Sequence, residues 1–281
     1  MDPIVSRTTW KTLEPVHAQV YFAVEAQEEY AALGFDVQDN RASGYFPARA
    51  AALGAVNAGV VQSTFFNFSA AACVFGMDRA WETATPGQLV EARYRGADRS
   101  LRRLCGDLLD GPGVVEAAEL ARTATTGCTP YGRPLYAGNA TLEWPEPPHL
   151  ALFHAITLLR EFRGDGHIAA LVVDGVSGLE AAVMHVAQGD SWTREPLRRT
   201  RGYTTEEWDA AAARLRQRGW LDAANDFTDV GREVRQRIED RTDVLALPAW
   251  QALGADGCAR LRELVRPLAH AVVQGGGLRI R

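Results

Sequence analysis

The segment 148–163 constrains the fold of this chain more than any other, because a helix drawn through it is apolar on nearly every side. One face of that helix carries the polar residues His154 and Glu161, and the opposite face carries Leu152 and Phe153. A helix that is apolar all round is buried. The polar side chains on it must therefore be paired, since burying an unpaired charge is costly.

Titratable residues gather at the end of this helix. Four of the six histidines lie between His149 and His185, and Glu161, Asp165 and His167 fall within seven residues. A carboxylate beside an imidazole fixes the tautomer of the ring and raises its basicity. We therefore predict an acid–base site in which His167 is the general base or acid, Asp165 orients it, and Glu161 is a further catalytic residue.

A ligand pocket is predicted beside this site, at the junction of two domains and bounded by the proline-rich segment 128–148. Arginines there can hold a substrate carboxylate or stabilise an oxyanion. The alanine-rich helices of the first half supply aromatic walls and a few polar anchors, which is the usual composition of a small-molecule pocket. The residues predicted to bind the ligand are Arg163, Arg133, His149, His154, Tyr45, Arg49, Asn67 and Asn139.

Two other interpretations of the same residues stay open, although neither is the leading one. The buried charges can form a salt-bridge and capping network that only stabilises the fold. The second is a metal site in the region of His149 to His185. His149 and His154 are five positions apart and no HExxH motif occurs, so we assign no metal ligands. We also predict no organic cofactor, because Lys11 is the only lysine and neither a Walker A nor a GxGxxG motif is present.

Composition indicates a globular protein of two domains. The chain has 281 residues, of which 47% are hydrophobic and 23% are charged. It has no apolar run of membrane-spanning length, and its first residues lack the layout of a signal peptide. The four cysteines are far apart and form no CxxC pair. We therefore expect a reduced, cytoplasmic protein with no membrane partner.

Local signals predict helices along most of the chain and few strands. Thr85-Pro86 is typical of a helix start, with a capping residue followed by proline at the first helical position. Glycines interrupt the apolar pattern at several places. We therefore predict separate helices over 87–95 and 97–109, and again over 148–163 and 167–173.

A run near the C-terminus carries a family resemblance. Residues 208–243 contain Leu215, Gly219, Leu221, Thr228 and Gly231 in a spacing that resembles the recognition helix, wing and following helix of MarR-like winged-helix domains. The whole chain is also similar to an actinobacterial family with a winged helix-turn-helix domain near its C-terminus. The residues shared with that family include Tyr45-Phe46, Arg49, Gly132-Arg133-Pro134, Pro148-His149 and Arg163-Gly164-Asp165-Gly166-His167.

The resemblance and the helix signals together give the expected fold class. It is mainly α, with a helical N-terminal domain packed on a winged-helix domain that has one small β-hairpin. The expected domains are the helical domain over 1–143, the winged-helix domain over 144–245, and a C-terminal helical extension over 246–281.

Charge argues against DNA binding by the winged helix. Between Ser191 and Asp240 ten arginines face ten acidic residues, a net charge of zero, whereas phosphate contacts need positive charge. The first turn of the expected recognition helix carries Glu206, Glu207 and Asp209, which repel phosphate. If DNA is a partner, the contacts come from the basic patch just before that helix, which consists of Arg194, Arg198, Arg199 and Arg201.

The leading functional hypothesis is a cofactor-independent enzyme of the lyase, isomerase or cyclase type. It acts on a small organic molecule, and the winged helix is a structural module. The resemblance and the preference for arginine over lysine imply a place in actinobacterial, natural-product metabolism. The alternative is a ligand-responsive transcription regulator whose inter-domain pocket binds a small effector. That alternative requires a homodimer that places the two recognition helices about one DNA turn apart. A third hypothesis, an interaction scaffold without a ligand, is left open by the sequence.

Overall fold

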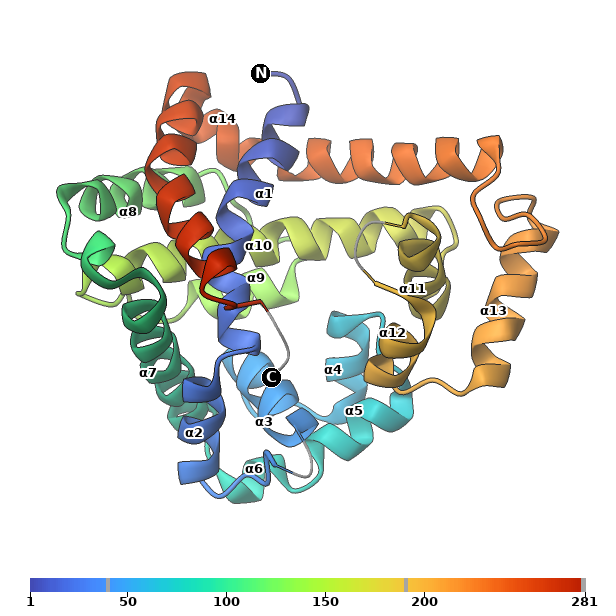
Figure 1. Cartoon of the computed structure of the whole chain (residues 1–281), viewed down its shortest axis with the longest axis horizontal. Coiled ribbons are helices and arrows are strands. Elements are labelled where there is room, and N and C mark those ends of the chain that lie inside the picture. Colours follow the sequence, from blue (N-terminus) through green and yellow to red (C-terminus); the bar gives the residue numbers. More distant parts are fainter. Residues whose placement is uncertain (39–40, 190–191, 279–281) are drawn as a thin grey trace. The chain divides into compact units, whose positions relative to one another are not determined.

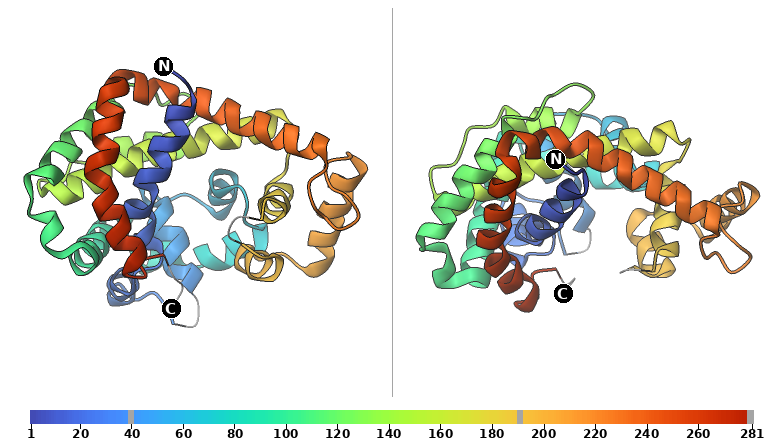
Figure 2. Two further views of the ribbon diagram at one scale, coloured as in Figure 1. Left: turned by 45° about the horizontal axis from the view of Figure 1, so that its top comes forward. Right: turned by 90° about the horizontal axis from the view of Figure 1, so that it is seen from above.

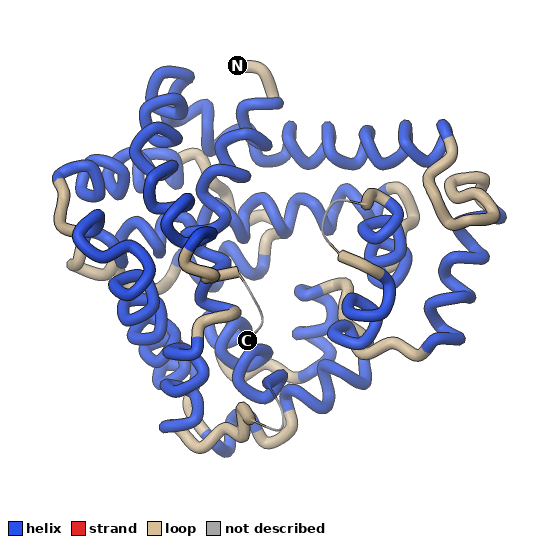
Figure 3. Tube along the Cα trace, in the orientation of Figure 1, coloured by secondary structure: helices blue, strands red, loops and turns tan. Residues whose placement is uncertain are grey.

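The structure is a computed structural model that describes residues 1–38, 41–189 and 192–278. Most of these residues lie in helices, and no strand forms within the described ranges (Figures 1 and 3). The prediction of a mainly α fold is confirmed.

None of the described helices is by itself long and apolar enough to cross a membrane. Only one bent pair of described helices has the length and composition of a membrane span. It consists of α10 (Pro148–Val173) and α11 (Gly178–Ala187), with an angle of 99° between them.

The chain divides into two compact units, each built from segments that are not consecutive. Unit 1 consists of residues 1–56, 76–166 and 243–281, and unit 2 consists of residues 57–75 and 167–242. The three consecutive domains predicted from the sequence are a different division of the chain.

Unit 1 contains most of the helices. They are α1 (Ile4–Ala18), η1 (Gln19–Tyr21), α2 (Val24–Ala32), α3 (Arg41–Ala50), η2 (Ala51–Leu53), α6 (Ala80–Thr83), α7 (Pro86–Cys105), η3 (Gly106–Leu109), α8 (Pro112–Thr125), α9 (Pro134–Ala140), the larger part of α10, and the second half of α14 (Asp229–Gln274).

The apolar helix predicted over 148–163 forms the core of unit 1. Residues Leu152, Phe153, Ile156 and Phe162 of α10 are at most 2% exposed. The helix does not end at Arg163, as predicted, but continues to Val173. Gly166 lies inside this helix and does not end it. A Cβ there would lie 2.7 Å from Nη1 of Arg133, so the glycine allows the arginine side chain to approach the helix closely.

Helix α7 also contains a glycine that allows a close contact and does not end the helix. Thr85 caps its start, since the Thr85 side chain accepts a hydrogen bond from Gln88 N and Pro86 occupies the first turn, which confirms the predicted start. The predicted break at Gly96 does not occur. A Cβ on Gly96 would lie 2.6 Å from Cα of Ala26, so the glycine lets α7 and α2 approach closely.

Helix α14 changes direction at Gly254, whose φ of 81° lies outside the helical region. The segment after Gly254 lies beside α8 in both views of Figure 2. Arg260 on this segment holds Glu116 of α8 through two contacts of 2.7 Å. The C-terminal part of the chain is therefore an integral part of unit 1.

Unit 2 is also helical. Its elements are α4 (Ala58–Phe65), most of α5 (Ala70–Met77), the last turns of α10, α11, α12 (Arg194–Arg201), α13 (Thr205–Gln217) and the first part of α14.

The small hairpin predicted after α13 is reduced to a single antiparallel bridge between Leu221 and Phe227 within the described residues. The loop between them is too tight to extend the pairing. Oδ1 of Asp222 accepts hydrogen bonds from the backbone N–H groups of Ala224 and Asp226, and Asn225 adopts a φ of 67°. The side chain thus orders the loop, while the backbone hydrogen bonds Asp222 N–Asp226 O and Thr228 N–Trp220 O flank the bridge.

Candidate functional site

Helices α12 and α13 form a helix-turn-helix in unit 2. The turn between them is Gly202-Tyr203-Thr204, a length typical of this motif. Gly202 has a φ of 74°, and a Cβ there would lie 2.6 Å from Cβ of Ala72, so this position requires glycine. Thr204 then caps α13 in a reciprocal pair of hydrogen bonds with Glu207.

Helix α13 has one buried and one exposed face. Trp208, Ala211, Ala212 and Leu215 are at most 3% exposed. The outer face carries Glu206, Asp209, Ala210 and the partly exposed Ala213, so its first half is acidic with small side chains in its centre. The predicted acidic first turn is therefore on the surface.

Three of the four arginines predicted to contact DNA have partners inside unit 2. Arg194 lies 2.7 Å from a carboxylate oxygen of Asp209 and 3.6 Å from one of Glu195. Arg198 donates to Glu195 at 2.8 Å and to the carbonyl oxygen of Tyr203 at 2.7 Å.

The other two arginines of this patch differ from each other. The guanidinium of Arg201 lies over the ring of Phe68, 4.4 Å from its centroid. The side chain of Arg199 is exposed and makes no hydrogen bond or ion pair within the described part of the chain. It is therefore the arginine of α12 that is most available to a phosphate.

The residues that carried the family resemblance contact one another after α13. Thr228 donates its hydroxyl hydrogen to the carbonyl oxygen of Gly219 at 2.6 Å and accepts a hydrogen bond from Gly231 N at 3.0 Å. The N–H of Thr228 donates to the carbonyl oxygen of Trp220 at 3.0 Å. A Cβ on Gly231 would lie 2.0 Å from that same oxygen. The pattern thus specifies how the start of α14 packs behind α13.

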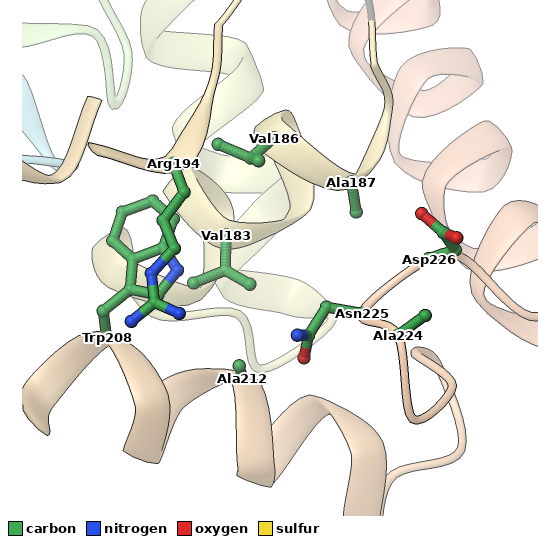
Figure 4. A pocket seen from close by; sticks show the side chains of 9 residues that line it. All are labelled: Val183, Val186, Ala187, Arg194, Trp208, Ala212, Ala224, Asn225 and Asp226. Carbon is green, nitrogen blue, oxygen red and sulfur yellow. The ribbon is translucent and has the colours of Figure 1, made fainter. Parts of the chain in front are cut away.

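A cavity of about 200 Å³ lies within unit 2, between α11, α13 and the loop 222–226 (Figure 4). None of the residues predicted as catalytic or ligand-binding lines it, although Arg194 of the predicted DNA patch does. The lining residues are Val183, Val186, Ala187, Arg194, Trp208, Ala212, Ala224, Asn225 and Asp226.

Sequence reasoning missed this cavity, although part of its signal was present. The spacing of Trp208, Ala211, Ala212 and Leu215 predicts an inward face of α13, and a tryptophan opposite alanines leaves unequal packing. The contribution of Asn225 could not be predicted, because it depends on the tight geometry of the loop.

The structure joins three of the predicted site residues in unit 1. Arg49 donates to the hydroxyl oxygen of Tyr45 and to Glu161, each at 3.2 Å. Glu161 also accepts a hydrogen bond from Arg160 at 2.8 Å. Although burial opposes ionisation of Glu161, the positive charges of Arg49 and Arg160 hold its pKa below the usual value. Glu161 is therefore an ionised partner of two arginines and has no proton to donate.

Asp165 is buried at the N-terminus of α9. One of its carboxylate oxygens accepts a hydrogen bond from Tyr136 N at 3.0 Å, in the first turn of that helix. Its other oxygen, Oδ1, is buried without a hydrogen-bond partner among the described residues. Burial raises the pKa of Asp165 to about 7. Of the predicted catalytic residues, Asp165 has the chemistry most suited to proton transfer.

The two predicted arginine anchors are held by other groups of unit 1. Arg163 donates to Asp243 at 3.1 Å, and Asp243 also pairs with Arg7 at 2.8 Å. Arg133 donates to the carbonyl oxygens of Phe162 and Leu245 and stacks on the ring of Phe162. No local signal predicted Asp243 as the partner, because it lies 80 residues from Arg163 along the chain.

Each of the predicted histidines has a different partner. Nε2 of His149 lies 2.6 Å from Asp98 Oδ1, and Nδ1 of His154 lies 2.5 Å from the hydroxyl oxygen of Tyr94. Burial lowers the pKa of His154 to about 4, so this ring is neutral. His167, which belongs to unit 2, has its Nδ1 2.9 Å from the hydroxyl oxygen of Thr242.

The two predicted asparagines also belong to different units. Asn139 is buried in unit 1, where it accepts a hydrogen bond from Arg93 at 2.9 Å and donates one to the carbonyl oxygen of Leu135. Asn67 belongs to unit 2, and its backbone N–H donates to the carbonyl oxygen of Phe65. Across the described ranges, no group of three or more His, Cys, Asp or Glu side chains is placed to hold a metal ion.

Two helices joined by a three-residue glycine turn, the second with one face exposed, define the helix-turn-helix class of proteins. The chain belongs to a helix-turn-helix family, whose sequence model matches residues 6–279. Neither the curated proteins nor the solved structures contain a match to this chain.

Proposed function

We propose that this protein is a transcription regulator that binds duplex DNA through α13, with α12 crossing the phosphate backbone. The helix-turn-helix formed by α12, the turn 202–204 and α13 carries this proposal, and the family match supports it. The finer resemblance to MarR-like winged helices and to an actinobacterial family belongs to the same proposal. In such proteins the second helix enters the major groove.

The exposed face of α13 is suited to a close approach to base edges. Ala210 and Ala213 lie in the middle of that face, where small side chains allow the helix to sit deep in a groove. Glu206, in the first turn, can accept a hydrogen bond from the amino group of a cytosine. An acidic first turn therefore favours particular bases while it disfavours unspecific binding to phosphate.

The charge balance of unit 2 makes a specific prediction about salt. Each phosphate contact adds about 0.9 to the slope of log affinity against log salt concentration. Because Arg194 and Arg198 are paired with carboxylates, we expect few such contacts and a shallow slope.

We predict that Arg199→Ala weakens binding to specific and unspecific duplexes by a similar factor and lowers the salt slope by about 1 for each bound subunit. Affinities measured by fluorescence anisotropy over a salt series test this prediction. An unchanged slope would show that Arg199 does not contact a phosphate.

Because the operator is unknown, the function is tested by selection from a pool of random-sequence duplexes at low salt. We expect enrichment of a sequence with two related half-sites about one helical turn apart, as a two-fold dimer requires. A pool that stays random after repeated rounds contradicts the proposal.

A second candidate function is the cofactor-independent acid–base enzyme, and the observation that favours it is Asp165. A buried carboxyl group with a pKa of about 7 and an oxygen without a partner has the properties of a general acid or base. A proton donor or acceptor at this position suits a lyase, isomerase or cyclase.

The enzyme candidate is tested by incubating the protein with a mixture of small metabolites and following each by mass spectrometry. The hypothesis predicts a conversion that the wild-type protein catalyses and the Asp165→Asn variant does not. If both proteins catalyse the conversion equally, Asp165 takes no part in the reaction.

A further inference from the structure

We propose that the cavity between α11, α13 and the loop 222–226 binds a small organic amine whose apolar part is about the size of one aromatic ring. The volume of about 200 Å³ sets the size. A cavity of ~150 Å³ with apolar walls is large enough to bind benzene. A single ring with a short polar substituent therefore fits this space.

The apolar part of the cavity wall comes mainly from two helices. Val183, Val186 and Ala187 project from α11, and Trp208 and Ala212 project from α13 (Figure 4). Such walls stabilise a hydrocarbon body by removing it from water. The flat ring of Trp208 is the largest of these surfaces and favours a planar ligand.

Charged and polar side chains lie at two sides of the cavity. Figure 4 shows Arg194 beside Trp208, and Asn225 and Asp226 on the side of the loop. The charge of Arg194 is compensated, because Asp209 lies 2.7 Å away and Glu195 lies 3.6 Å away. The carboxylate of Asp226, by contrast, makes no hydrogen bond or ion pair with the residues that the structure describes.

The surroundings of the cavity are negative overall. Asp222 lies in the same loop as Asp226 and uses its carboxylate for backbone hydrogen bonds. Arg216 donates to the side-chain oxygen of Asn225. Arg194, Arg198 and Arg216 thus face four carboxylates, those of Glu195, Asp209, Asp222 and Asp226, and the first two arginines are already paired. The net charge is −1 and Asp226 is the carboxylate without a partner among the described residues, so an ammonium group beside it is favoured over an anion.

An amine in this cavity would bridge the second helix of the motif, α13, to α11 and to the loop that follows α13. It would therefore fix the position of α13 relative to these neighbours. A ligand shifts an equilibrium between conformations that it binds unequally. We therefore infer that the amine alters the affinity of the protein for DNA, an inference that rests on the proposed DNA binding.

The experiment uses the full chain and three probes of nearly equal size: benzylamine, benzyl alcohol and benzoate. Isothermal titration calorimetry is expected to show that benzylamine binds most tightly and benzoate least. Because Asp226 is exposed, Asp226→Asn is expected to weaken benzylamine binding by about threefold, and to leave benzyl alcohol nearly unchanged.

Two further variants keep the test specific. Ala212→Leu fills the cavity and is expected to abolish binding of benzylamine and of benzyl alcohol. Asp229→Asn removes a carboxylate that is 92% exposed in the same unit and does not line the cavity, and it is expected to change nothing. Absence of benzylamine binding, tighter binding of benzoate, or an equal loss in Asp226→Asn and Asp229→Asn would overturn the proposed site.

The calorimetric titration is carried out without DNA, so it tests the amine site independently of the proposed DNA binding. If benzylamine binds as expected but no duplex is selected, the amine site is supported and the proposed function is contradicted. If a duplex is selected and benzylamine binds without changing the affinity for it, the regulatory role is overturned.

Discussion

Replacing Gly231 by alanine is expected to destabilise the protein by about 3 kcal/mol. The added Cβ would lie 2.0 Å from the carbonyl oxygen of Trp220 and 2.9 Å from Cδ1 of Phe227. The oxygen belongs to the backbone, and it also accepts the N–H of Thr228, so it cannot move without loss of that hydrogen bond. Urea unfolding followed by tryptophan fluorescence measures the change.

The matched control is Gly87→Ala in the first turn of α7. A Cβ at Gly87 meets no atom within 4 Å, so the same substitution is expected to stabilise the protein by about 0.5 kcal/mol through the unfolded state. Equal effects of the two variants would contradict the close contact behind α13.

The second large effect is expected at Asp165. Because burial raises its pKa to about 7, the folded protein keeps this proton up to near pH 7, whereas the unfolded chain loses it near its ordinary value of about 4. The stabilising contribution of the group is present below about pH 4 and is lost as the pH rises to about 7. Asp165→Asn retains an oxygen for Tyr136 N and removes this dependence.

We therefore expect Asp165→Asn to be more stable than the wild type at pH 8, by up to about 4 kcal/mol, and to have nearly the same stability at pH 4. Chemical unfolding at a series of pH values gives the difference in the free energy of unfolding. If that difference is constant from pH 4 to pH 8, the carboxyl group ionises normally in the folded protein. Asp229→Asn, at an exposed position, is the control.

Helix content and the central buried helix could be predicted from the sequence, because both depend on local patterns. The apolar stretch after Pro148 predicted a core helix, and Thr85-Pro86 predicted the start of α7. The helix ends were wrong at Gly96 and Gly166. A glycine that breaks a helix and a glycine that lets a neighbour approach are identical in one sequence, and only the packing partner distinguishes them.

The candidate site was less predictable, because it depends on which distant side chains meet. The sequence indicated that Glu161, Arg163 and Asp165 need partners, but these are Arg49, Asp243 and the backbone of Tyr136, which are far away along the chain. The hairpin was predicted from the short turn between Leu221 and Phe227 and from the resemblance. In the structure the side chain of Asp222 closes the loop instead.

The central claim, that α13 binds DNA specifically, is tested most directly by one pair of variants measured against the selected duplex and a scrambled one. Ala210→Glu adds a charge at the centre of the exposed face of α13, and Ala252→Glu makes the same change at an exposed position of α14 in unit 1. We predict that Ala210→Glu abolishes the preference for the selected duplex while Ala252→Glu retains it. Equal affinities of both variants for the selected duplex would contradict the claim.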